Sequence, residues 1–260
     1  MLQIEPVKAF QDNYIWLISA PGSNLAFVVD PGDANPVISA LQDAGKTLVG
    51  ILITHHHADH IGGLDALLRH QQVPVYGPSS QRIGQISNTV TETDRIDVLG
   101  HTFRIIEVPG QTREHIAWFS DDPALAHPVL FCGDTLFAAG CGRMFEGSPP
   151  QMHASLQKLA ALPADTAVYC AHEYTMGNLR FAKAAMPDNR NLQVRCGQEQ
   201  AKRDQGLPTI PSSIGAELDT NPFLRCNDAQ VVESLAAESR LEGSEPWQVF
   251  GALRRWKDEF

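Results

Sequence analysis

Apolar and polar positions predict a mixed α/β fold in roughly the first two thirds of the chain. Short runs of β-branched and aromatic residues predict strands at 15–19, 25–30, 48–54, 73–77, 103–110, 115–120, 128–134 and 167–175. Between them, helical spacing predicts helices at 35–45, 61–70 and 152–162. The run 48–54 is almost entirely apolar, which is typical of a strand buried on both faces. The alternation of strands and helices indicates βαβ units.

The pattern changes after about residue 175. Helical spacing predominates at 177–186, 191–203, 228–239 and 244–260, with few strand signals. The segment 205–225 carries prolines and glycines, so we expect it to be irregular. The sequence therefore predicts two domains: an α/β domain over residues 1–175 and a helical C-terminal domain over residues 176–260.

Composition narrows the function classes. The 260 residues are 43% apolar and 19% charged, as in an ordinary globular protein. A formal net charge of −10 argues against a nucleic-acid partner, although it leaves room for a local basic pocket. No signal peptide or 18-residue apolar run is visible, so we expect no membrane partner. Five widely spaced cysteines without a C-x-x-C pair favour the reducing cytoplasm over a disulfide framework.

The segment THHHADH, residues 54–60, carries the densest candidate chemistry. In an extended chain side chains alternate, so His55 and His57 point the same way. The chain must then turn into the predicted helix, which lets Asp59 and His60 face back. Imidazole and carboxylate groups are ligands of zinc and related metals. Two pairs of ligands suit two metals better than one, whereas the alternative is a polar loop with solvated histidines.

Further candidate ligands follow other predicted strands. Asp134 ends the strand 128–134, and His172 comes after VYC in the run 167–175. The loop VPGQTREHI follows the strand that begins at residue 103. An aspartate or histidine at such a position is by itself a weak signal, because these residues also form turns. Together with THHHADH, however, they converge on one end of a sheet.

These motifs resemble those of the metallo-β-lactamase superfamily, and within it the glyoxalase II (hydroxyacylglutathione hydrolase) family. THHHADH specifies only the superfamily. The closer resemblance lies in DNYIW, VVDPGD, LFCGDTLFAAGCGRMFEG, CAHEYTMGNLRFA and the terminal LRRWKDEF, which span nearly the whole chain. The resemblance implies a four-layer αββα sandwich with a C-terminal helical domain. It also implies hydrolysis of the thioester of S-D-lactoylglutathione to glutathione and D-lactate.

The resemblance also implies a set of metal ligands. His55 and His57 would hold one divalent metal, Asp59, His60 and His172 the other, and Asp134 would bridge both. Zinc is the first candidate for the two ions, with iron or manganese as alternatives.

One ligand position departs from the family pattern P-G-H-T-x-G-H, because this chain has Gln111 at the first histidine and Glu114 at the second glycine. Gln111 could ligate weakly, His115 could replace it, or only one metal could bind firmly. A glutamine oxygen is a weak donor to zinc. We therefore expect reduced occupancy or altered geometry at the His55/His57 site.

The implied reaction needs an activated water and an anion-binding pocket. A metal lowers the pKa of bound water from about 16 toward about 7, and the resemblance gives Asp59 the role of orienting that water. Arg143, Tyr174, Arg254 and Lys257 match the family's glutathione-binding positions. Without the resemblance, Arg254 and Lys257 would read as a solvated helix face. The expected partner is a small-molecule glutathione thioester, and we expect a monomer.

Other functions remain open from sequence alone. The superfamily includes metallo-β-lactamases, nucleases and a mononuclear iron persulfide dioxygenase, and the helical tail with its R-x-x-K argues against the first two. The loss of a histidine at position 111 makes the persulfide dioxygenase harder to dismiss. A metal-weakened protein that binds glutathione thioesters without turning them over is the non-enzyme alternative. No G-x-S-x-G motif indicates a serine hydrolase.

Overall fold

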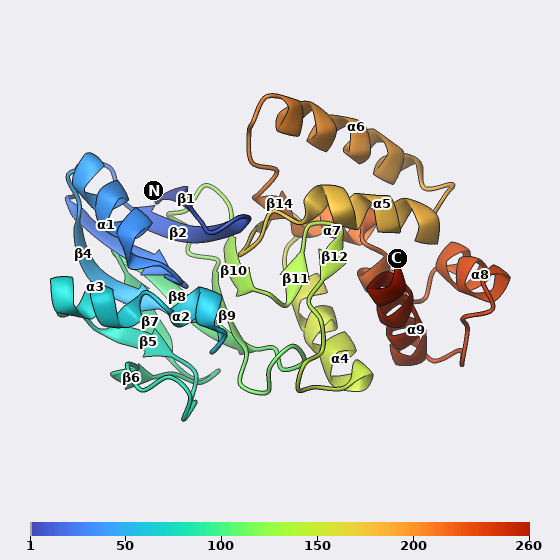
Figure 1. Cartoon of the computed structure of the whole chain (residues 1–260), viewed down its shortest axis with the longest axis horizontal. Coiled ribbons are helices and arrows are strands. Elements are labelled where there is room, and N and C mark those ends of the chain that lie inside the picture. Colours follow the sequence, from blue (N-terminus) through green and yellow to red (C-terminus); the bar gives the residue numbers. More distant parts are fainter. Residues whose placement is uncertain (1) are drawn as a thin grey trace. The chain divides into compact units, whose positions relative to one another are not determined.

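The computed structural model describes residues 2–260, which form two compact units. The first contains the residues up to Glu107 together with Glu114–Gly133, and the second contains Val108–Arg113 and Asp134–Phe260. Each unit is described by itself below. Figure 1 gives the order of the elements along the chain.

The first unit begins with a mixed six-stranded sheet. Its strands lie in chain order: β1 (Gln3–Ala9), β2 (Asn13–Ser19), β3 (Leu25–Val29), β4 (Thr47–Leu52), β5 (Val75–Gly77) and β6 (Asn88–Thr89). The first three strands pair antiparallel, and β3 to β6 pair parallel. Parallel neighbours require crossovers, which are supplied by α1 (Ala34–Asp43) and by α2 (Ala58–Ile61) with α3 (Leu64–His70). The predicted βαβ rhythm is confirmed.

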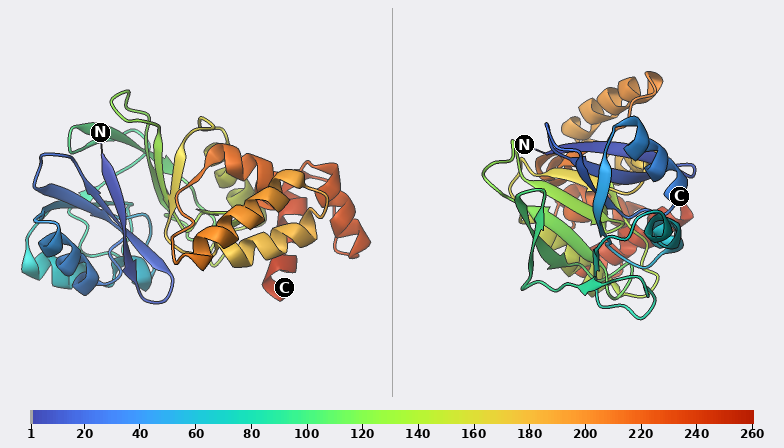
Figure 2. Two further views of the ribbon diagram at one scale, coloured as in Figure 1. Left: turned by 90° about the horizontal axis from the view of Figure 1, so that it is seen from above. Right: turned by 90° about the vertical axis from the view of Figure 1, so that its left-hand side faces the viewer.

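One face of this sheet packs against α1 and α3. Val37 and Leu41 of α1 and Leu64 and Leu67 of α3 are buried in one cluster with the alternate apolar residues of the strands. In the right-hand view of Figure 2, both helices lie on one side of the sheet and the green strands of a second sheet lie on the other. Burial on both faces explains why β4 is almost continuously apolar.

The strands on that other side are antiparallel. They are β7 (Arg95–Val98), β8 (His101–Glu107), β9 (Ile116–Ser120) and β10 (Val129–Gly133), each paired with the next. All five residues of β9 are buried. The indole N–H of Trp118 donates to the carbonyl of Ile53 at 3.1 Å, which ties the two sets of strands together directly behind the THHHADH segment.

The second unit is mainly helical. Its short strands are β11 (Leu136–Phe137), paired with β12 (Gly140–Cys141), and β13 (Ala167–Cys170), paired with β14 (Ser212–Ser213). Its helices are α4 (Pro149–Ala160), α5 (Thr175–Ala185), α6 (Arg190–Asp204), α7 (Ile214–Thr220), the 3₁₀ helix η1 (Pro222–Leu224), α8 (Ala229–Ala237) and α9 (Pro246–Glu259). Phe181, Phe223, Phe250 and Trp256 form its aromatic core, with ring centroids 5.3–5.8 Å apart.

Two predicted elements are wrong in detail, and two strands were missed. The helix expected at 61–70 is two helices, because α2 already begins at Ala58 and the chain breaks at Gly62 and Gly63. The segment 205–225, expected to be irregular, contains β14, α7 and η1. Its prolines and glycines made the segment look irregular, although a helix begins within it. At the start of this helix the Ser213 hydroxyl caps the N–H of Ala216. The strands β1 and β7, by contrast, were not predicted at all.

The cysteine thiols and the apolar character of the helices bear on two expectations from composition. All five cysteines are free thiols, as expected. Across residues 2–260, none of the helices combines the length and the apolar character that a membrane crossing needs.

Candidate metal and substrate sites

In the first unit, the segment after β4 brings two imidazoles together. Nε2 of His55 lies 3.1 Å from Nδ1 of His57, in agreement with the alternation expected from sequence. Two nitrogens that each lie 2.0–2.1 Å from one tetrahedral zinc are about 3.3 Å apart. The pair therefore fits the spacing of two ligands to one ion. His56 turns elsewhere, and its ring nitrogen Nε2 contacts the guanidinium of Arg82 at 2.6 Å.

Asp59 and His60 lie on α2, and both are held by neighbouring side chains. The carboxamide of Asn13 donates to Asp59 at 3.0 Å. Nδ1 of His60 lies 3.0 Å from Oδ2 of Asp30, while its Nε2 lies 3.6 Å from Asp59. Since an ionised carboxylate only accepts, His60 carries its proton on Nδ1. Its Nε2 lone pair is then the one available to a metal.

Asp30 organises this part of the unit. Besides His60, it accepts from the backbone N–H of Thr54 at 2.8 Å and from the Thr54 hydroxyl at 2.6 Å. These contacts make Asp30 a support for His60 and for the start of the THHHADH segment. Its backbone is left-handed, with φ 53°. The role of Asn13 was missed, although the DNYIW motif contains it.

Close backbone packing places α2 against the loop that carries Asp30. A Cβ on Gly32 would lie 1.9 Å from the carbonyl oxygen of Asp59, and one on Gly63 would lie 2.6 Å from that of Pro31. No side chain fits at these distances. The glycines in VVDPGD and in IGG are therefore required by the approach of two backbones.

In the second unit, Asp134 lies between Gln111 and His172. All three side chains are buried. Gln111 Nε2 donates to Oδ2 of Asp134 at 2.7 Å, and Nε2 of His172 lies 3.3 Å from Oδ1. Because a carboxylate cannot donate, the carboxamide of Gln111 must present its nitrogen to Asp134. Its oxygen Oε1 is then buried without a hydrogen-bond partner within residues 2–260.

The orphaned oxygen of Gln111 matters for a metal. A buried acceptor that forms no hydrogen bond costs free energy unless something else, such as a cation, meets it. Each unit offers imidazole nitrogens and carboxylate oxygens, and the second unit adds one amide oxygen. These donor types are chemically suited to divalent metals. His115, the alternative ligand, instead stacks on His55 with ring centroids 4.5 Å apart, and its Nδ1 lies 3.1 Å from the Ile116 carbonyl.

The four predicted substrate-binding residues lie in the second unit, but in different environments. The Tyr174 ring stacks on His172 with centroids 4.7 Å apart and is 40% exposed. Arg143 is exposed and lies 3.4 Å from Asp258. Arg254 is only 4% exposed, and its guanidinium bonds the carbonyl of Cys141 at 3.0 Å and Asp258 at 3.0 Å. The idea that the α9 cations form a solvated face is therefore wrong for Arg254.

Lys257 is also largely enclosed. Its ammonium contacts the side-chain oxygen of Asn178 and lies over the rings of Phe181 and Phe223. Burial, reinforced by the positive charge of Arg254, lowers the pKa of Lys257 to about 8. A lysine with this pKa loses its charge just above neutral pH.

Comparison with known proteins extends the picture to the whole chain. The model of the metallo-beta-lactamase superfamily matches residues 10–172, and that of the hydroxyacylglutathione hydrolase C-terminus matches residues 173–260. Curated hydroxyacylglutathione hydrolases of Ectopseudomonas mendocina and Cupriavidus metallidurans are 49% and 50% identical, with full coverage of both chains.

Solved structures confirm the predicted fold class. ETHE1 from Myxococcus xanthus aligns with a TM-score of 0.64 and 23% identity over 99% of this chain and 98% of its own. The BLEG-1 B3 metallo-beta-lactamase aligns with a TM-score of 0.62 and 24% identity over 86% of this chain and 99% of its own. At such identities the likeness shows the metallo-β-lactamase fold alone. Sequence identity along the full length shows more: the chain belongs to the hydroxyacylglutathione hydrolase family of the metallo-β-lactamase superfamily.

Proposed function

We propose that this protein is an enzyme, a metal-dependent thioester hydrolase that cleaves S-D-lactoylglutathione to glutathione and D-lactate. The observation that carries this proposal is identity of about half of all residues, along the entire chain, with curated hydroxyacylglutathione hydrolases. The match includes the helical C-terminal part that the family model for this hydrolase covers.

Membership of the superfamily implies divalent metal binding, and the donor groups described above fit it. We propose two ions, zinc first, with iron or manganese as alternatives. His55 and His57 would serve one ion, Asp59, His60 and His172 the other, and Asp134 both. Asp30 and Asn13 support this set by holding His60 and Asp59. When bound, the metals would supply an activated water and would polarise the thioester carbonyl.

The chain's own residues then control the geometry of the reaction. Asp59 accepts a hydrogen bond from Asn13, and in this proposal it would also accept one from the attacking water and so orient it. His172 is held between Asp134 and the ring of Tyr174, so its orientation is set from two sides. Cleavage breaks the carbon–sulfur bond and releases a thiolate. A thiolate is a good leaving group, so no strong general acid is needed.

Gln111 sets this protein apart from the family's histidine pattern. The buried oxygen Oε1 is the atom that can ligate, while the amide nitrogen is committed to Asp134. An amide oxygen is a weaker donor to zinc than an imidazole. We therefore propose that the His55/His57 site is under-occupied or distorted compared with a site that has a full set of histidines.

For the substrate, we propose that Arg143, Tyr174, Arg254 and Lys257 bind the glutathione part. Glutathione carries carboxylates, and three of these residues are cations within the second unit. Arg143 and Arg254 both contact Asp258, which offsets part of their charge. Lys257, which contacts the neutral side chain of Asn178, is then the cation whose charge is least compensated by its own neighbours.

The pKa of Lys257 predicts a pH dependence of substrate binding. Below pH 8 the ammonium is charged and attracts a carboxylate, and above pH 8 it becomes neutral. We expect kcat/KM to fall above pH 8, by up to about tenfold per pH unit where only the charged form binds. In Lys257→Met this decline should disappear and KM should be high at every pH. Arg255→Met on the same helix, which pairs with exposed Glu242, is the matched control and should keep the decline.

The contribution of Lys257 to the free energy of unfolding should change with pH in the opposite direction to kcat/KM. The folded state lowers the pKa of Lys257 below its ordinary value of 10.5, so between pH 8 and 10.5 the unfolded chain binds more protons. The contribution of Lys257 to the free energy of unfolding therefore rises with pH in that window. If the protein unfolded above pH 8, kcat/KM and the free energy of unfolding would fall together. Neutralisation of Lys257 lowers kcat/KM without lowering the free energy of unfolding.

The proposal extends to the domain organisation and to the state of the protein in the cell. We retain the α/β domain at residues 1–175 and the helical domain at 176–260 as a functional division, in which the second domain binds substrate. We likewise propose a monomeric state and a cytoplasmic location, the latter from the widely spaced cysteines. The net charge of −10 argues against a nucleic-acid partner, and the lack of an 18-residue apolar run argues against a membrane partner.

A single assay separates this function from its alternatives. We would incubate the purified protein with S-D-lactoylglutathione and follow thioester absorbance, free thiol and dissolved oxygen together. The proposed hydrolase releases one thiol per thioester without consuming oxygen. A persulfide dioxygenase would consume oxygen when supplied with glutathione persulfide and would leave the thioester intact. A binding protein without catalysis would retain the thioester ligand but release no thiol.

A further inference from the structure

The turn between β11 and β12 is bonded to side chains from three helices. Ala138 O accepts from Asn178 of α5 at 2.9 Å, and Cys141 O accepts from Arg254 of α9 at 3.0 Å. Asn221, which follows α7, donates to the carbonyl oxygens of Phe137 at 3.3 Å and Gly140 at 2.9 Å. The turn (residues 137–140) is therefore linked to Lys257 through Asn178, and Arg254 bonds Cys141, the residue that directly follows the turn.

A buried carboxylate holds the tip of this turn. Glu217 of α7 is fully buried, and its Oε2 accepts the backbone N–H of Ala139 at 2.8 Å and the amide of Asn221 at 2.9 Å. Ala139 has a left-handed backbone with φ 55°, which costs free energy for a residue with a Cβ. The hydrogen bond from its N–H to an ionised acceptor offsets that cost.

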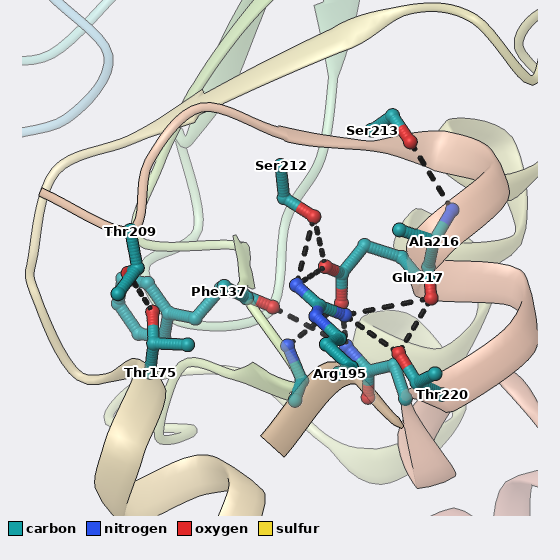
Figure 3. Close-up of polar contacts among 12 residues, drawn as sticks. Phe137, Thr175, Arg195, Thr209, Ser212, Ser213, Ala216, Glu217 and Thr220 are labelled. Carbon is teal, nitrogen blue, oxygen red and sulfur yellow. Dashed lines mark hydrogen bonds and ion pairs between the residues drawn. The ribbon is translucent and has the colours of Figure 1, made fainter. Parts of the chain in front are cut away.

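The other carboxylate oxygen of Glu217 is bound to α6. The Arg195 guanidinium donates to Oε1 at 2.7 Å, and the Ser212 hydroxyl also contacts it. Figure 3 shows these groups around Arg195, whose second nitrogen donates to Thr220 at 2.6 Å. Every lone pair of Glu217 thus has a donor. A buried ion pair adds little net stability compared with apolar packing, so its geometry is the more informative property.

The turn also borders the proposed catalytic groups of the second unit. The Phe137 ring packs edge-on against His172 with centroids 5.9 Å apart and against Tyr174 with centroids 5.2 Å apart. Asp134 precedes the turn by three residues, and Arg143 follows it by three. A shift of the turn would therefore move groups proposed to contact the substrate on both sides.

We propose that Glu217, held by Arg195, is a positioning residue that fixes the 137–140 turn so that Lys257, Arg254 and Tyr174 are arranged for glutathione. This inference rests on the proposed function, which supplies the ligand. Glu217 itself is enclosed and does not touch the substrate. It acts through the hydrogen bond that it accepts from the backbone N–H of Ala139 in the turn.

The test compares Glu217→Gln with Glu199→Gln. Glu199 is also nearly buried, but it lies on α6, pairs with Lys202 at 2.9 Å, and lines the same cavity of about 450 Å³ as Arg195. In Glu217→Gln, one carboxylate oxygen becomes an amide nitrogen, so two of the four donors lose their acceptor. We expect KM, and the Kd of glutathione measured by calorimetry, to rise about tenfold. Hydrogen exchange at the Ala139 amide should also accelerate, whereas Glu199→Gln should match the parent protein.

A second variant guards against misfolding of Glu217→Gln. Asn221→Ser keeps an acceptor for the N–H of Phe223 that caps η1, yet it removes the amide that bonds Phe137 and Gly140. It should weaken glutathione binding in the same direction. The proposal is overturned if folded variants at both positions bind glutathione and exchange the turn amides as Glu199→Gln does.

Failure of the proposed function would look different. In that case the parent protein itself would neither bind glutathione nor cleave the thioester. Hydrogen exchange at the Ala139 amide would then still report whether Glu217 holds the turn. A role of the turn in substrate binding would not be demonstrated.

Discussion

Replacing Asp134 by asparagine is expected to lower kcat for thioester hydrolysis by about 100-fold or more and to reduce the bound metal. The substitution preserves volume but removes the charge proposed to serve both ions. Loss of a residue that merely supports a metal ligand already costs about 10- to 100-fold in affinity or activity. The new amide would also face the N–H₂ of Gln111, which now donates to the carboxylate at 2.7 Å.

The measurement is metal content by elemental analysis alongside kcat. Asp122→Asn is a matched control, because Asp122 also lies beside a histidine, His101, at 3.5 Å, yet it belongs to no proposed metal site. It should retain its metal and its kcat within about twofold. Asp134→Asn with normal metal content and turnover would remove Asp134 from the proposed centre.

Replacing Gln111 by histidine is expected to raise metal occupancy and activity. The variant exchanges a weak amide donor for an imidazole, the better ligand for zinc and iron. We expect affinity for the weaker ion to improve on the order of tenfold, with kcat rising accordingly. The gain is limited by the loss of the hydrogen bond from Gln111 to Asp134. Titration of chelated protein with zinc, followed by calorimetry, measures both binding steps.

A control must show that the added histidine acts through its position. Gln85 offers it, because its amide donates to Asp65 at 2.8 Å in a similar glutamine–aspartate pair. Gln85→His should leave the titration unchanged. If Gln111→His binds metal no better than the parent protein, position 111 is not a ligand position in this chain.

Much of the fold was predictable because the relevant signals are local. Short runs of β-branched and aromatic residues identified most strands of the first unit, and the continuous apolar run of β4 marked a strand covered on both faces. By contrast, β7 has only one fully buried residue, Val98, so its pattern is weak. The helix α7 was hidden by the prolines and glycines around it. It is stabilised by contacts that sequence does not display, including those of Glu217 with Arg195.

The candidate site was predictable to a similar degree. Strand alternation predicted that His55 and His57 face the same way, and their nitrogens are 3.1 Å apart. The support of Asp59 by Asn13, 46 residues earlier, depends on the pairing of strands and cannot be read from spacing. The enclosure of Arg254 was equally hidden, because its carbonyl partner at Cys141 is 113 residues away.

Removal of metal tests the central claim most directly. The protein would be dialysed against a strong chelator, assayed on S-D-lactoylglutathione, and assayed again after stepwise addition of zinc, iron or manganese. We expect hydrolysis to disappear with the metal and to return in proportion to the metal rebound, up to two ions per chain. Thioester cleavage at the original rate by metal-free protein would contradict the claim.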